Sequence, residues 1–354
     1  MPVSRRQFLI AAAGASAALG LSACNASAGA TGGAADASAS SGPAGEAGAF
    51  PVTIAHKYGE TVIEQAPTRV VTVGLKEQDD LLALGLVPVG ATKWLSQEDD
   101  QIVGPWARAA LGDQPLPKAL DATDGIPFEE VAALQPDLIS ALYAGLTAEQ
   151  HDKLSQIAPV VAQPEDYIDY GIPWDVQAET VGRAVGQPAR MTELVAASRK
   201  ALTDAAAAHP EFKGKTSMVV TPYEGLFAYG AEDPRVRLLT DLGFVLPPDF
   251  DEVLAKGSSF GGNISAERAE ILDVDALICF AEEGDEQKQV ETALFRRLDV
   301  ATQGRTVWLR DADQATPPFS FLTVLSLPYL LEAFVPRVAA AVDGDPGTST
   351  AQSA

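Results

Sequence analysis

Hydrophobic residues between positions 70 and 161 occur in short continuous runs separated by amphipathic segments. The run at 70–75 is rich in β-branched residues, as expected for a parallel strand buried on both faces. The following segment has helical spacing and is stopped by Gly85. This alternation predicts an α/β lobe with a parallel sheet. Its expected strands are 70–75, 87–91, 137–141 and 159–161, and its expected helices are 78–84, 128–134 and 147–155.

The second half of the chain repeats this order. The expected strands are 216–220, 275–280 and 306–309, and the expected helices are 236–242, 265–272 and 321–341, the last interrupted near Pro328 and Pro336. Residues of the two halves also align at constant offsets, which suggests two related lobes, although helix-then-strand units share this pattern for physical reasons alone. The aligned residues are Glu129, Leu134, Asp137 and Ile139 with Glu267, Leu272, Asp275 and Leu277, and Leu81, Leu84, Gly85 and Val87 with Leu239, Leu242, Gly243 and Val245.

A long helix is predicted between the two halves, at 189–208. The segment contains no Gly or Pro and is dominated by Ala, with apolar residues on one face. At 1.5 Å per residue it would be about 30 Å long, the diameter of a small domain. We expect it to span both lobes and to limit how far they swing. The alternative is an ordinary surface helix of one lobe.

The first 23 residues have the pattern of an export signal. The twin-arginine sequence Ser4-Arg5-Arg6-Gln7-Phe8-Leu9 precedes an apolar run at 10–19. That run is shorter than the roughly 20 residues of a membrane-spanning helix. Leu21-Ser22-Ala23-Cys24 resembles the bacterial lipobox, which implies cleavage after residue 23 and acylation of Cys24, with palmitate as one of the chains. The alternative is a chance Arg-Arg pair before a signal peptide that is cut elsewhere.

Composition divides the rest of the chain. Residues 24–50 are almost entirely Ala, Gly and Ser and predict a flexible tether, and the tail at 343–354 reads as disordered. The roughly 290 residues between them exceed what one core usually holds, so two lobes are expected. We place the N-terminal lobe at 51–175, the connecting helical segment at 176–209 and the C-terminal lobe at 210–342.

The chain is acidic, with 48 Asp and Glu against 25 Lys and Arg and a formal net charge of −23. This balance argues against nucleic acid and anionic membrane surfaces as direct partners. Of the two cysteines, Cys24 is assigned to lipid and Cys279 is expected to be a buried small hydrophobe. The three histidines, His56, His151 and His209, lie far apart in the sequence and are expected to be separate surface or capping residues. No resident metal site is therefore predicted.

Several motifs occur in order along the chain. They are Pro67-x-Arg69-Val70-Val71, Leu81-Leu82-Ala83-Leu84-Gly85-Leu86-x-Pro88-Val89-Gly90, Phe128-Glu129-Glu130-Val131-Ala132-Ala133-Leu134-x-Pro136-Asp137-Leu138-Ile139, Ile157-Ala158-Pro159-Val160 and Val181-Gly182-x-Ala184-x-Gly186. This ordered set resembles the helical-backbone (class III) periplasmic or lipoprotein substrate-binding proteins of ABC importers. The stretch at 74–79 and that from Trp94 to Trp106 are most similar to the iron–siderophore branch.

The resemblance implies two Rossmann-like α/β lobes joined by one long α-helix, with the ligand cleft between them. It implies a monomeric, non-enzymatic lipoprotein on the outer face of the cell membrane. This lipoprotein would capture a ferric siderophore and deliver it to the transmembrane subunits of an ABC permease, a role in iron transport. The chelate fills the iron's coordination shell, so no cofactor or protein metal ligand is needed. Haem and cobalamin remain alternatives, since Tyr143 or Tyr223 could ligate haem iron.

Candidate ligand residues follow the predicted strands, because ligands of α/β sheets bind at the carboxyl ends of the strands. Aromatic rings there suit a bulky chelate, although such rings could also simply cap the sheet edges. By resemblance to hydroxamate-binding members, a ring is expected after the second strand, at the position of Tyr143 and at two positions in the second lobe. The ligand-binding residues predicted on both grounds are Trp94, Trp106, Tyr143, Tyr223, Phe260, Phe319, Glu77 and Gln78.

The polar part of recognition departs from the family pattern. Hydroxamate-binding members commonly have an Arg ahead of the helix that begins at Phe128, where this chain has Asp121-Ala122-Thr123-Asp124. The acidic balance favours neutral or cationic hydroxamate complexes over anionic catecholates, and a local cluster of Arg108, Arg235 and Arg237 would reverse that preference.

Permease docking is expected at Glu129 and Glu267. The vitamin B12-binding member places a Glu at each matching position, and one exposed carboxylate per lobe would give a salt-sensitive contact at two points. The alternative is that both are first-turn acids favoured by the helix dipole.

An exported hydrolase is the alternative from a different class. Gly257-Ser258-Ser259-Phe260-Gly261 fits the Gly-x-Ser-x-Gly elbow, but that elbow needs a later His, and no histidine follows Ser259. No pair of acids is singled out for glycosidase chemistry. We therefore expect a binding protein without catalytic residues.

Overall fold

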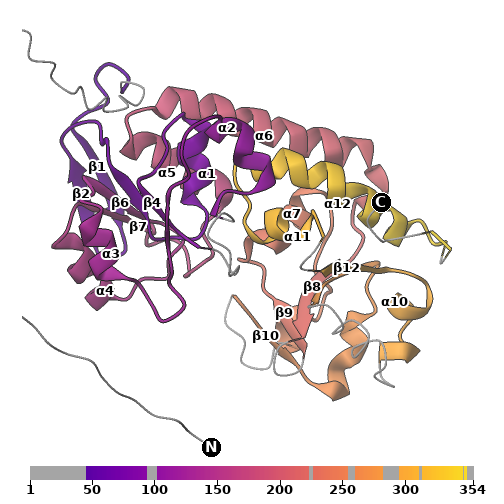
Figure 1. Ribbon diagram of the computed structural model, residues 1–354. Coiled ribbons are helices and arrows are strands. Elements are labelled where there is room, and N and C mark those ends of the chain that lie inside the picture. The colour runs from indigo at the N-terminus through magenta and orange to yellow at the C-terminus, as the bar shows by residue number, and fades with distance from the viewer. Residues whose placement is uncertain are drawn as a thin grey trace, which may run out of the picture. The chain divides into compact units, whose positions relative to one another are not determined.

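Two mixed layers of strands and helices are joined by a long helix (Figure 1). The computed structural model describes residues 45–93, 102–222, 226–253, 260–281, 295–310, 313–345 and 347–348, all within the unit Ser41–Ala354. In these residues the strands form two five-stranded sheets and one separate two-stranded hairpin. We call the part around the first large sheet the N-terminal lobe and the part around the second the C-terminal lobe.

The sheet of the N-terminal lobe is parallel throughout, with strand order β5-β4-β3-β6-β7, which confirms the predicted α/β lobe. Its helices follow the strands as the alternation predicted, and β4 begins three residues later than expected, after Pro88. The strands are β3 (Val70–Thr72), β4 (Gly90–Thr92), β5 (Lys118–Leu120), β6 (Leu138–Ala141) and β7 (Val160–Ala162). The helices are α1 (Glu77–Ala83), η2 (Pro105–Ala107), α2 (Arg108–Leu111), α3 (Phe128–Ala133), α4 (Ala148–Ser155) and α5 (Trp174–Ala184).

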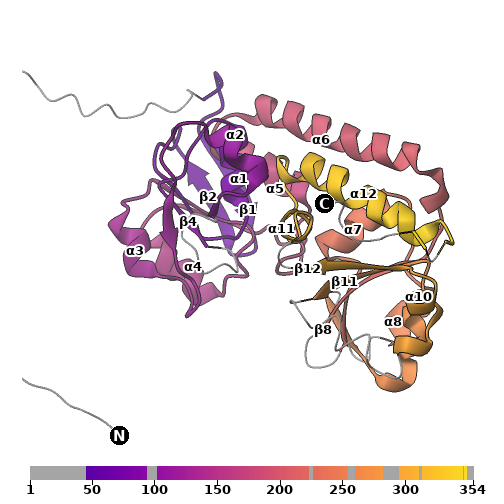
Figure 2. The ribbon, with the colours of Figure 1, turned by 45° about the vertical axis from the view of Figure 1, so that its right-hand side comes forward.

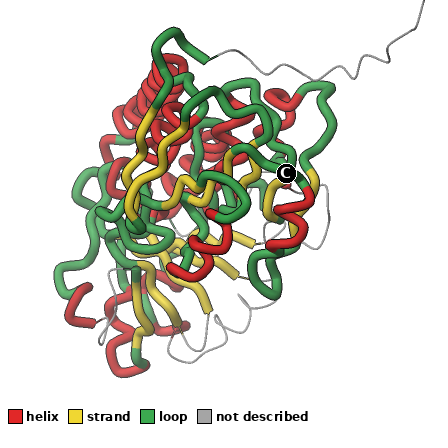
Figure 3. The backbone as a smooth tube through the Cα atoms, turned by 90° about the vertical axis from the view of Figure 1, so that its left-hand side faces the viewer, coloured by secondary structure: helices red, strands yellow, loops and turns green. Residues whose placement is uncertain are grey.

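A hairpin of β1 (Val52–His56) and β2 (Gly59–Ile63) was not predicted. Alternate residues of both strands are buried, the pattern of strands with one face against a core. The hairpin lies on the side of the N-terminal lobe that faces the viewer in Figure 3.

The sheet of the C-terminal lobe is mixed, with strand order β10-β9-β8-β11-β12. Strands β8, β11 and β12 are parallel as expected, while β9 and β10 are antiparallel additions at one edge. The strands are β8 (Ser217–Pro222), β9 (Leu226–Tyr229), β10 (Gly261–Ile264), β11 (Ala276–Ala281) and β12 (Thr306–Arg310). The helices are η3 (Pro210–Phe212), α7 (Pro234–Asp241), α8 (Phe250–Val253), η4 (Ala266–Leu272), η5 (Phe295–Arg297), α10 (Asp299–Thr302), α11 (Thr316–Ser320) and α12 (Ser326–Val342).

The aligned aspartates make the same hydrogen bonds in both lobes. Asp137, before β6, accepts 2.8 Å bonds from the backbone N–H and the hydroxyl of Thr68, before β3. Asp275, before β11, accepts the same two bonds from Thr216, before β8, at 2.8 and 2.9 Å. Each carboxylate therefore ties together the starts of two neighbouring parallel strands.

Gly85 and Gly243 end α1 and α7 in the same way. Their φ angles of 75° and 110° lie in the left-handed region that favours glycine. The residue after each glycine donates its N–H to the carbonyl five residues earlier, at 2.9 and 3.0 Å. The shared hydrogen bonds and helix ends support two lobes built on one pattern.

Helix α6 (Pro188–Ala208) spans the two lobes (Figures 1 and 2). It packs against α5 of the N-terminal lobe and α12 of the C-terminal lobe, and Ser198 on its buried face donates a 2.9 Å bond to the carbonyl of Val324. The predicted spanning helix is confirmed, and the alternative of a surface helix confined to one lobe is wrong. Pro188 occupies the first turn, where a missing N–H costs no intrahelical bond.

Two predicted helices differ in detail. The C-terminal segment is split before Ser326, and Pro328 lies in the first turn of α12 rather than interrupting it, since a first-turn proline removes no intrahelical bond. Pro336 lies inside α12, which continues to Val342. The helix expected at 265–272 is the 3₁₀ segment η4, with non-helical angles at Arg268.

Strand residues alternate between separate cores. In β3, Val70 faces a large apolar cluster that also contains residues of α5, α6, α7 and α12, whereas Val71 faces a smaller cluster under α3 and α4. In β11, Ile278 faces the large cluster, and Cys279, which is buried as expected, faces a third one. The large cluster is thus shared by both lobes.

Among the described residues, every helix is too short or too polar to span a membrane.

Candidate functional site

Buried charges are concentrated in the first turn of α1, directly after β3. Lys76, Glu77, Asp79 and Asp80 are each at most 1% exposed. Glu77 accepts backbone N–H bonds from Tyr143 at 3.0 Å and from Lys76 at 3.1 Å. Burial raises the pKa of Glu77, although these hydrogen bonds act to lower it. Glu77 therefore orders the loop between β3 and α1 and connects it to the end of β6.

The next carboxylate joins the lobes. Asp79 accepts a 2.6 Å bond from the indole N–H of Trp106 and a 2.9 Å bond from the hydroxyl of Thr323, which precedes α12. Burial raises the pKa of Asp79 to about 6. Asp80 accepts a 2.7 Å bond from Gln177 on α5, and burial raises its pKa as well.

Lys76 supplies a positive charge among these acids. Its Nζ lies 4.0 Å from the centroid of the Tyr143 ring and 3.4 Å from the carbonyl oxygen of Leu322, to which it donates. Burial lowers the pKa of Lys76 to about 8, although nearby carboxylates favour the charged form. The ammonium thus contacts a ring of the N-terminal lobe and a carbonyl before α12.

Tyr143 follows β6 and is 5% exposed. Its ring meets that of Tyr170 edge-on at 5.3 Å, and the Tyr170 hydroxyl donates to the carbonyl of Ala144 at 3.2 Å. Burial raises the pKa of Tyr143, so the phenol is neutral near pH 7.

Rings of the C-terminal lobe gather around Arg235. Its guanidinium carbon lies 3.7 Å from the centroid of the Tyr229 ring and 5.4 Å from that of Phe280. Arg235 also makes a bidentate pair with Asp233, with bonds of 2.8 and 2.6 Å, and this carboxylate is fully buried. Burial disfavours the charged guanidinium, but Asp233 outweighs that effect and raises the pKa of Arg235.

The two sets of side chains interact across the lobes. The charges of Asp233 and Arg235 affect the pKa of both the Tyr143 hydroxyl and the Lys76 ammonium. We call the set that includes both lobes the interlobe aromatic site. It consists of Lys76, Tyr143, Tyr170, Tyr229, Arg235 and Phe280.

The predicted ligand residues fall into four groups. Tyr143 lies in the interlobe aromatic site, and Phe260 lies beside it, 5.9 Å from the Tyr229 ring. Phe319 is fully buried between Phe280 and Phe334, as part of the core beneath the site. Trp94 and Tyr223 lie outside the described residues, as does Cys24.

The remaining three predicted ligand residues support the site from α1 and η2. Glu77 orders the β3–α1 loop, and Gln78 is fully buried with its amide donating to the carbonyls of Leu75 and Ile102 at 3.3 and 3.2 Å. Half-buried Trp106 is bound to Asp79, and its ring lies 5.9 Å from that of Tyr329. In this structure these side chains connect parts of the protein to one another.

Arg235 was considered in the sequence only as one of three arginines that could cluster. The structure separates their surroundings, since Arg237 donates to the carbonyl of Gly171 and exposed Arg108 begins α2. The sequence signal for Arg235 was the Asp233-Pro234 start of α7, where the Asp side chain accepts the N–H of Arg235 at 2.9 Å. That cap places acid and guanidinium side by side.

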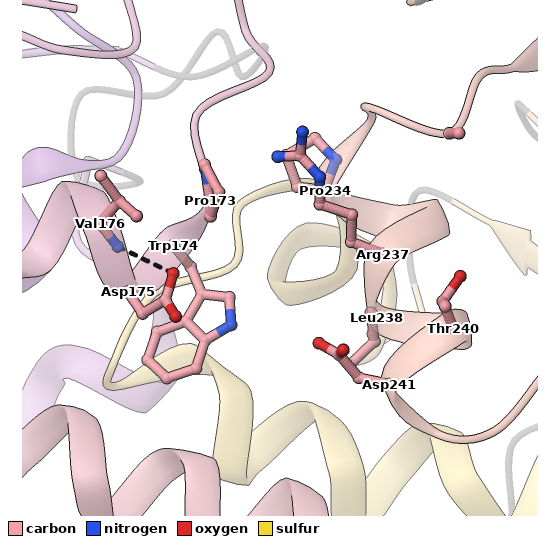
Figure 4. A pocket seen from close by; sticks show the side chains of 10 residues that line it. Pro173, Trp174, Asp175, Val176, Pro234, Arg237, Leu238, Thr240 and Asp241 are labelled. Carbon is pink, nitrogen blue, oxygen red and sulfur yellow. Dashed lines mark hydrogen bonds between the residues drawn. The ribbon is translucent and has the colours of Figure 1, made fainter. Parts of the chain in front are cut away.

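A cavity of about 430 Å³ lies near this site, between α5 and α7 (Figure 4). Trp174 and Asp175 form one wall, and Arg237 and Asp241 approach from the other. Burial and the nearby Asp175 charge raise the pKa of Asp241. The full lining is Pro173, Trp174, Asp175, Val176, Ala231, Pro234, Arg237, Leu238, Thr240 and Asp241, and within the described ranges it includes no predicted ligand residue.

The two predicted docking residues occupy matching places. Glu129 is exposed in the first turn of α3, and Glu267 is exposed in the first turn of η4. A hydrogen bond to its own backbone N–H and another to Ser265 lower the pKa of Glu267. Both are therefore available on the surface of their lobes, and their role in docking stays a prediction.

The expectation of three separate histidines is wrong for one pair. His56 is 6% exposed and hydrogen-bonded to Thr61 at 3.0 Å, and its ring centroid lies 5.1 Å from that of His151, with Tyr58 stacked on the latter at 4.7 Å. Burial, and then the neighbouring His151, lower the pKa of His56. The unpredicted hairpin brings His56 and His151 together.

Among described residues there is no group of three or more His, Cys, Asp or Glu that could hold a metal ion.

Comparison with known proteins identifies the family. The model of the family described as periplasmic binding protein matches residues 70–303, which include most of both sheets. The chain belongs to the periplasmic binding protein family. Members of this family are non-enzymatic transport components, so the hydrolase alternative is excluded and the prediction of a two-lobed substrate-binding fold is confirmed.

Two solved members resemble the chain over nearly their full length. A periplasmic solute-binding protein from Mycobacterium smegmatis is 34% identical, with a TM-score of 0.71 and coverage of 82% of this chain and 98% of that one. PiaA from Streptococcus pneumoniae, solved in complex with ferrichrome, is 27% identical, with a TM-score of 0.73 and coverage of 83% and 99%.

A curated relative matches over a shorter stretch. The ABC transporter substrate-binding lipoprotein YhfQ of Bacillus subtilis is 25% identical over 201 residues, 54% of this chain and 58% of that protein. The chain thus spans little more than half the length of this periplasmic binding protein.

Proposed function

We propose that this protein captures a ferric siderophore between its lobes and delivers it to an ABC import permease. The observation that carries the proposal is the interlobe aromatic site, in which Arg235, stacked on Tyr229 in one lobe, acts electrostatically on Tyr143 of the other. Rings from both lobes can bury the apolar arms of a chelate, and a guanidinium can donate to its oxygens. The similarity to the ferrichrome complex of PiaA supports the same ligand class.

The charges around the site favour a complex of low net charge. Arg235 is already neutralised by Asp233, and Lys76 lies among the acids of α1. A highly anionic catecholate complex would need surplus positive charge, whereas a hydroxamate complex such as ferrichrome would not. We therefore favour a hydroxamate ligand, with haem or cobalamin as the alternatives.

Transport requires export and docking in addition to binding. We propose that residues 1–23 direct export by the twin-arginine route, that Cys24 carries the lipid, and that a tether from residue 24 lets a monomer reach the permease from the outer face of the membrane. The tether is shorter than the predicted 24–50, because the Glu46 carboxylate accepts N–H bonds from Ala189 and Arg190 at the start of α6, at 3.2 and 3.1 Å. The lipoprotein description of YhfQ supports the anchor. Glu129 and Glu267 would each meet a basic residue of the permease.

A tryptophan-fluorescence titration tests the binding step. The chain from residue 25 onward would be titrated with ferric hydroxamates, ferric catecholates, haem and cobalamin. We expect saturable quenching by a ferric hydroxamate and none by its iron-free form. Quenching by haem or cobalamin alone would replace the ligand class, and binding of none of them would refute the function.

A matched pair of variants tests the site. Tyr229→Ala should weaken ferric hydroxamate binding by roughly 1–3 kcal/mol, because its ring stacks on Arg235. Tyr167→Ala is the control, because that ring lies 5.9 Å from Arg237, outside the interlobe aromatic site. Equal effects of the two substitutions would remove Tyr229 from the ligand site.

Docking needs a separate measurement. Glu129→Arg together with Glu267→Arg should leave siderophore affinity unchanged and lower uptake by cells. The control exchanges the neighbouring exposed Glu130 and Glu270. Normal uptake with the first pair would contradict the docking role.

A further inference from the structure

We propose that Lys76 is a positioning residue of the ligand site, whose buried ammonium holds Tyr143 against the C-terminal lobe and must be charged for tight binding. The inference rests on the proposed function, because it concerns how the interlobe aromatic site is kept in shape for a ferric siderophore. Lys76 is 1% exposed, so it acts through Tyr143 rather than on the ligand.

The contacts of the ammonium fix its role. Its Nζ lies 4.0 Å from the Tyr143 ring centroid, within the distance at which a cation is attracted to an aromatic face. The same nitrogen donates to the carbonyl of Leu322 at 3.4 Å. Leu322 precedes α12, and the next residue but one, Val324, is bound to Ser198 of the spanning helix. One charge therefore connects a proposed ligand ring to the segment that joins α11 to α12.

The backbone of Tyr143 is held from the same turn. Glu77, the neighbour of Lys76, accepts the N–H of Tyr143 at 3.0 Å. Main chain and ring of Tyr143 are thus each fixed by one residue of the same loop. Without the ammonium the ring would keep its backbone anchor and lose the contact that sets its orientation toward Tyr229 and Arg235.

The charges that face the ammonium come from both lobes. Asp80, Glu77 and Asp79 face it from α1, and Asp233 and Arg235 face it from the start of α7. The four carboxyl groups favour the charged ammonium, and the guanidinium of Arg235 disfavours it. A neutral amine would leave the carboxyl groups without this positive charge, which would weaken the contact between the lobes as well as the ring contact.

This arrangement predicts a pH dependence of ligand binding. Since burial lowers the pKa of Lys76 to about 8, the ammonium loses its proton as the pH rises through that value. Ferrichrome is a suitable probe, because its uncharged complex does not titrate in this range. Affinity should be constant below about pH 7 and about tenfold weaker near pH 9.5.

Lys76→Met tests the inference. The substitution keeps the length of the side chain and removes the charge, so ferrichrome affinity near pH 7 should fall about tenfold and should change less between about pH 7 and pH 9.5 than in the unaltered protein. A residual change would come from Asp80, whose raised pKa of about 8 lies in the same range. The matched control is Lys153→Met, since exposed Lys153 lies 5.5 Å from the Phe128 ring, outside the ligand site. The control should keep both the affinity and the pH profile of the unaltered protein.

The possible results separate this inference from the proposed function. Ferrichrome binding that is independent of pH in the unaltered protein, or unchanged affinity of Lys76→Met, would overturn the role of Lys76 and leave siderophore binding standing. If Lys76→Met does not fold, the pH profile of the unaltered protein decides by itself. Absence of binding by any ferric siderophore at every pH would instead refute the proposed function.

Discussion

Removal of Arg235 should leave a buried carboxylate without its counter-charge. Asp233 is fully buried, and its two oxygens accept bonds of 2.8 and 2.6 Å from the guanidinium. Breaking a buried ion pair by removing one partner costs about 3–5 kcal/mol, because the remaining charge is left without compensation. We therefore expect Arg235→Leu to lower the free energy of unfolding by about this amount. Lost packing on Tyr229 would add to the effect.

A second substitution isolates the charge effect. Asp233→Asn combined with Arg235→Leu removes both charges, and the Asn oxygen can still accept the N–H of residue 235 in the first turn of α7. The double variant should recover about 2–3 kcal/mol of the loss. Urea unfolding, followed by tryptophan fluorescence and by far-UV circular dichroism, gives the free energies if the two transitions coincide.

Two results would refute this reasoning. Arg235→Leu within about 1 kcal/mol of the unaltered protein would mean that Asp233 is solvated or otherwise paired. A double variant as unstable as the single one would show that lost packing, and not the unpaired charge of Asp233, accounts for the lower free energy of unfolding. The double variant should in either case bind ferrichrome weakly, since the donor at the interlobe aromatic site is gone.

Two further predictions concern the carboxylates that hold the lobes. Because the pKa of Asp79 is raised to about 6 in the folded protein, its contribution to stability is present below about pH 4 and is lost as the pH rises through 6. In urea unfolding, the free energy of unfolding of Asp79→Asn should therefore rise by about 2–3 kcal/mol relative to that of the unaltered protein between pH 4 and pH 7. A difference that stays constant over this range would contradict the burial of the Asp79 charge. Asp137→Ala and Asp275→Ala should each lower the free energy of unfolding by about 1–2 kcal/mol, because the hydrogen bonds to the strand starts are lost. Asp204→Ala, on an exposed face of α6, should lower it by less than about 0.5 kcal/mol. Equal costs for all three would remove the shared role of the aligned aspartates.

Local patterns in the sequence determined the architecture. The β-branched run at Val70 became β3, the central strand of the N-terminal sheet, and the apolar run at 275–280 became β11, an interior strand of the C-terminal sheet. Continuous apolar runs suit positions that are buried on both faces of a sheet. The segment without Gly or Pro became α6, within one residue of its predicted start. Asp137 and Asp275 aligned because both perform the same task before a parallel strand. Each of these features depends on residues close in sequence or on a repeated pattern.

Features that depend on distant segments were missed. The sequence placed His56 and His151 apart, but a hairpin that was not predicted packs one against the other. Strands β9 and β10 were missed because the four-residue segment at Gly261 begins with two glycines and has little strand character of its own. Its pairing with β9 supplies the hydrogen bonds that stabilise it.

The sequence by itself determined that aromatic and charged residues follow the strands, and that the chain is built from two related lobes on one long helix. Tertiary structure alone decided which of those residues face the other lobe. Tyr143 faces the charges of Arg235 and Asp233, whereas Phe319, from an equally plausible strand-end position, is fully buried in the core. Burial of a side chain depends on which remote elements pack over it, here α12 and the residues before it, and no local pattern encodes that.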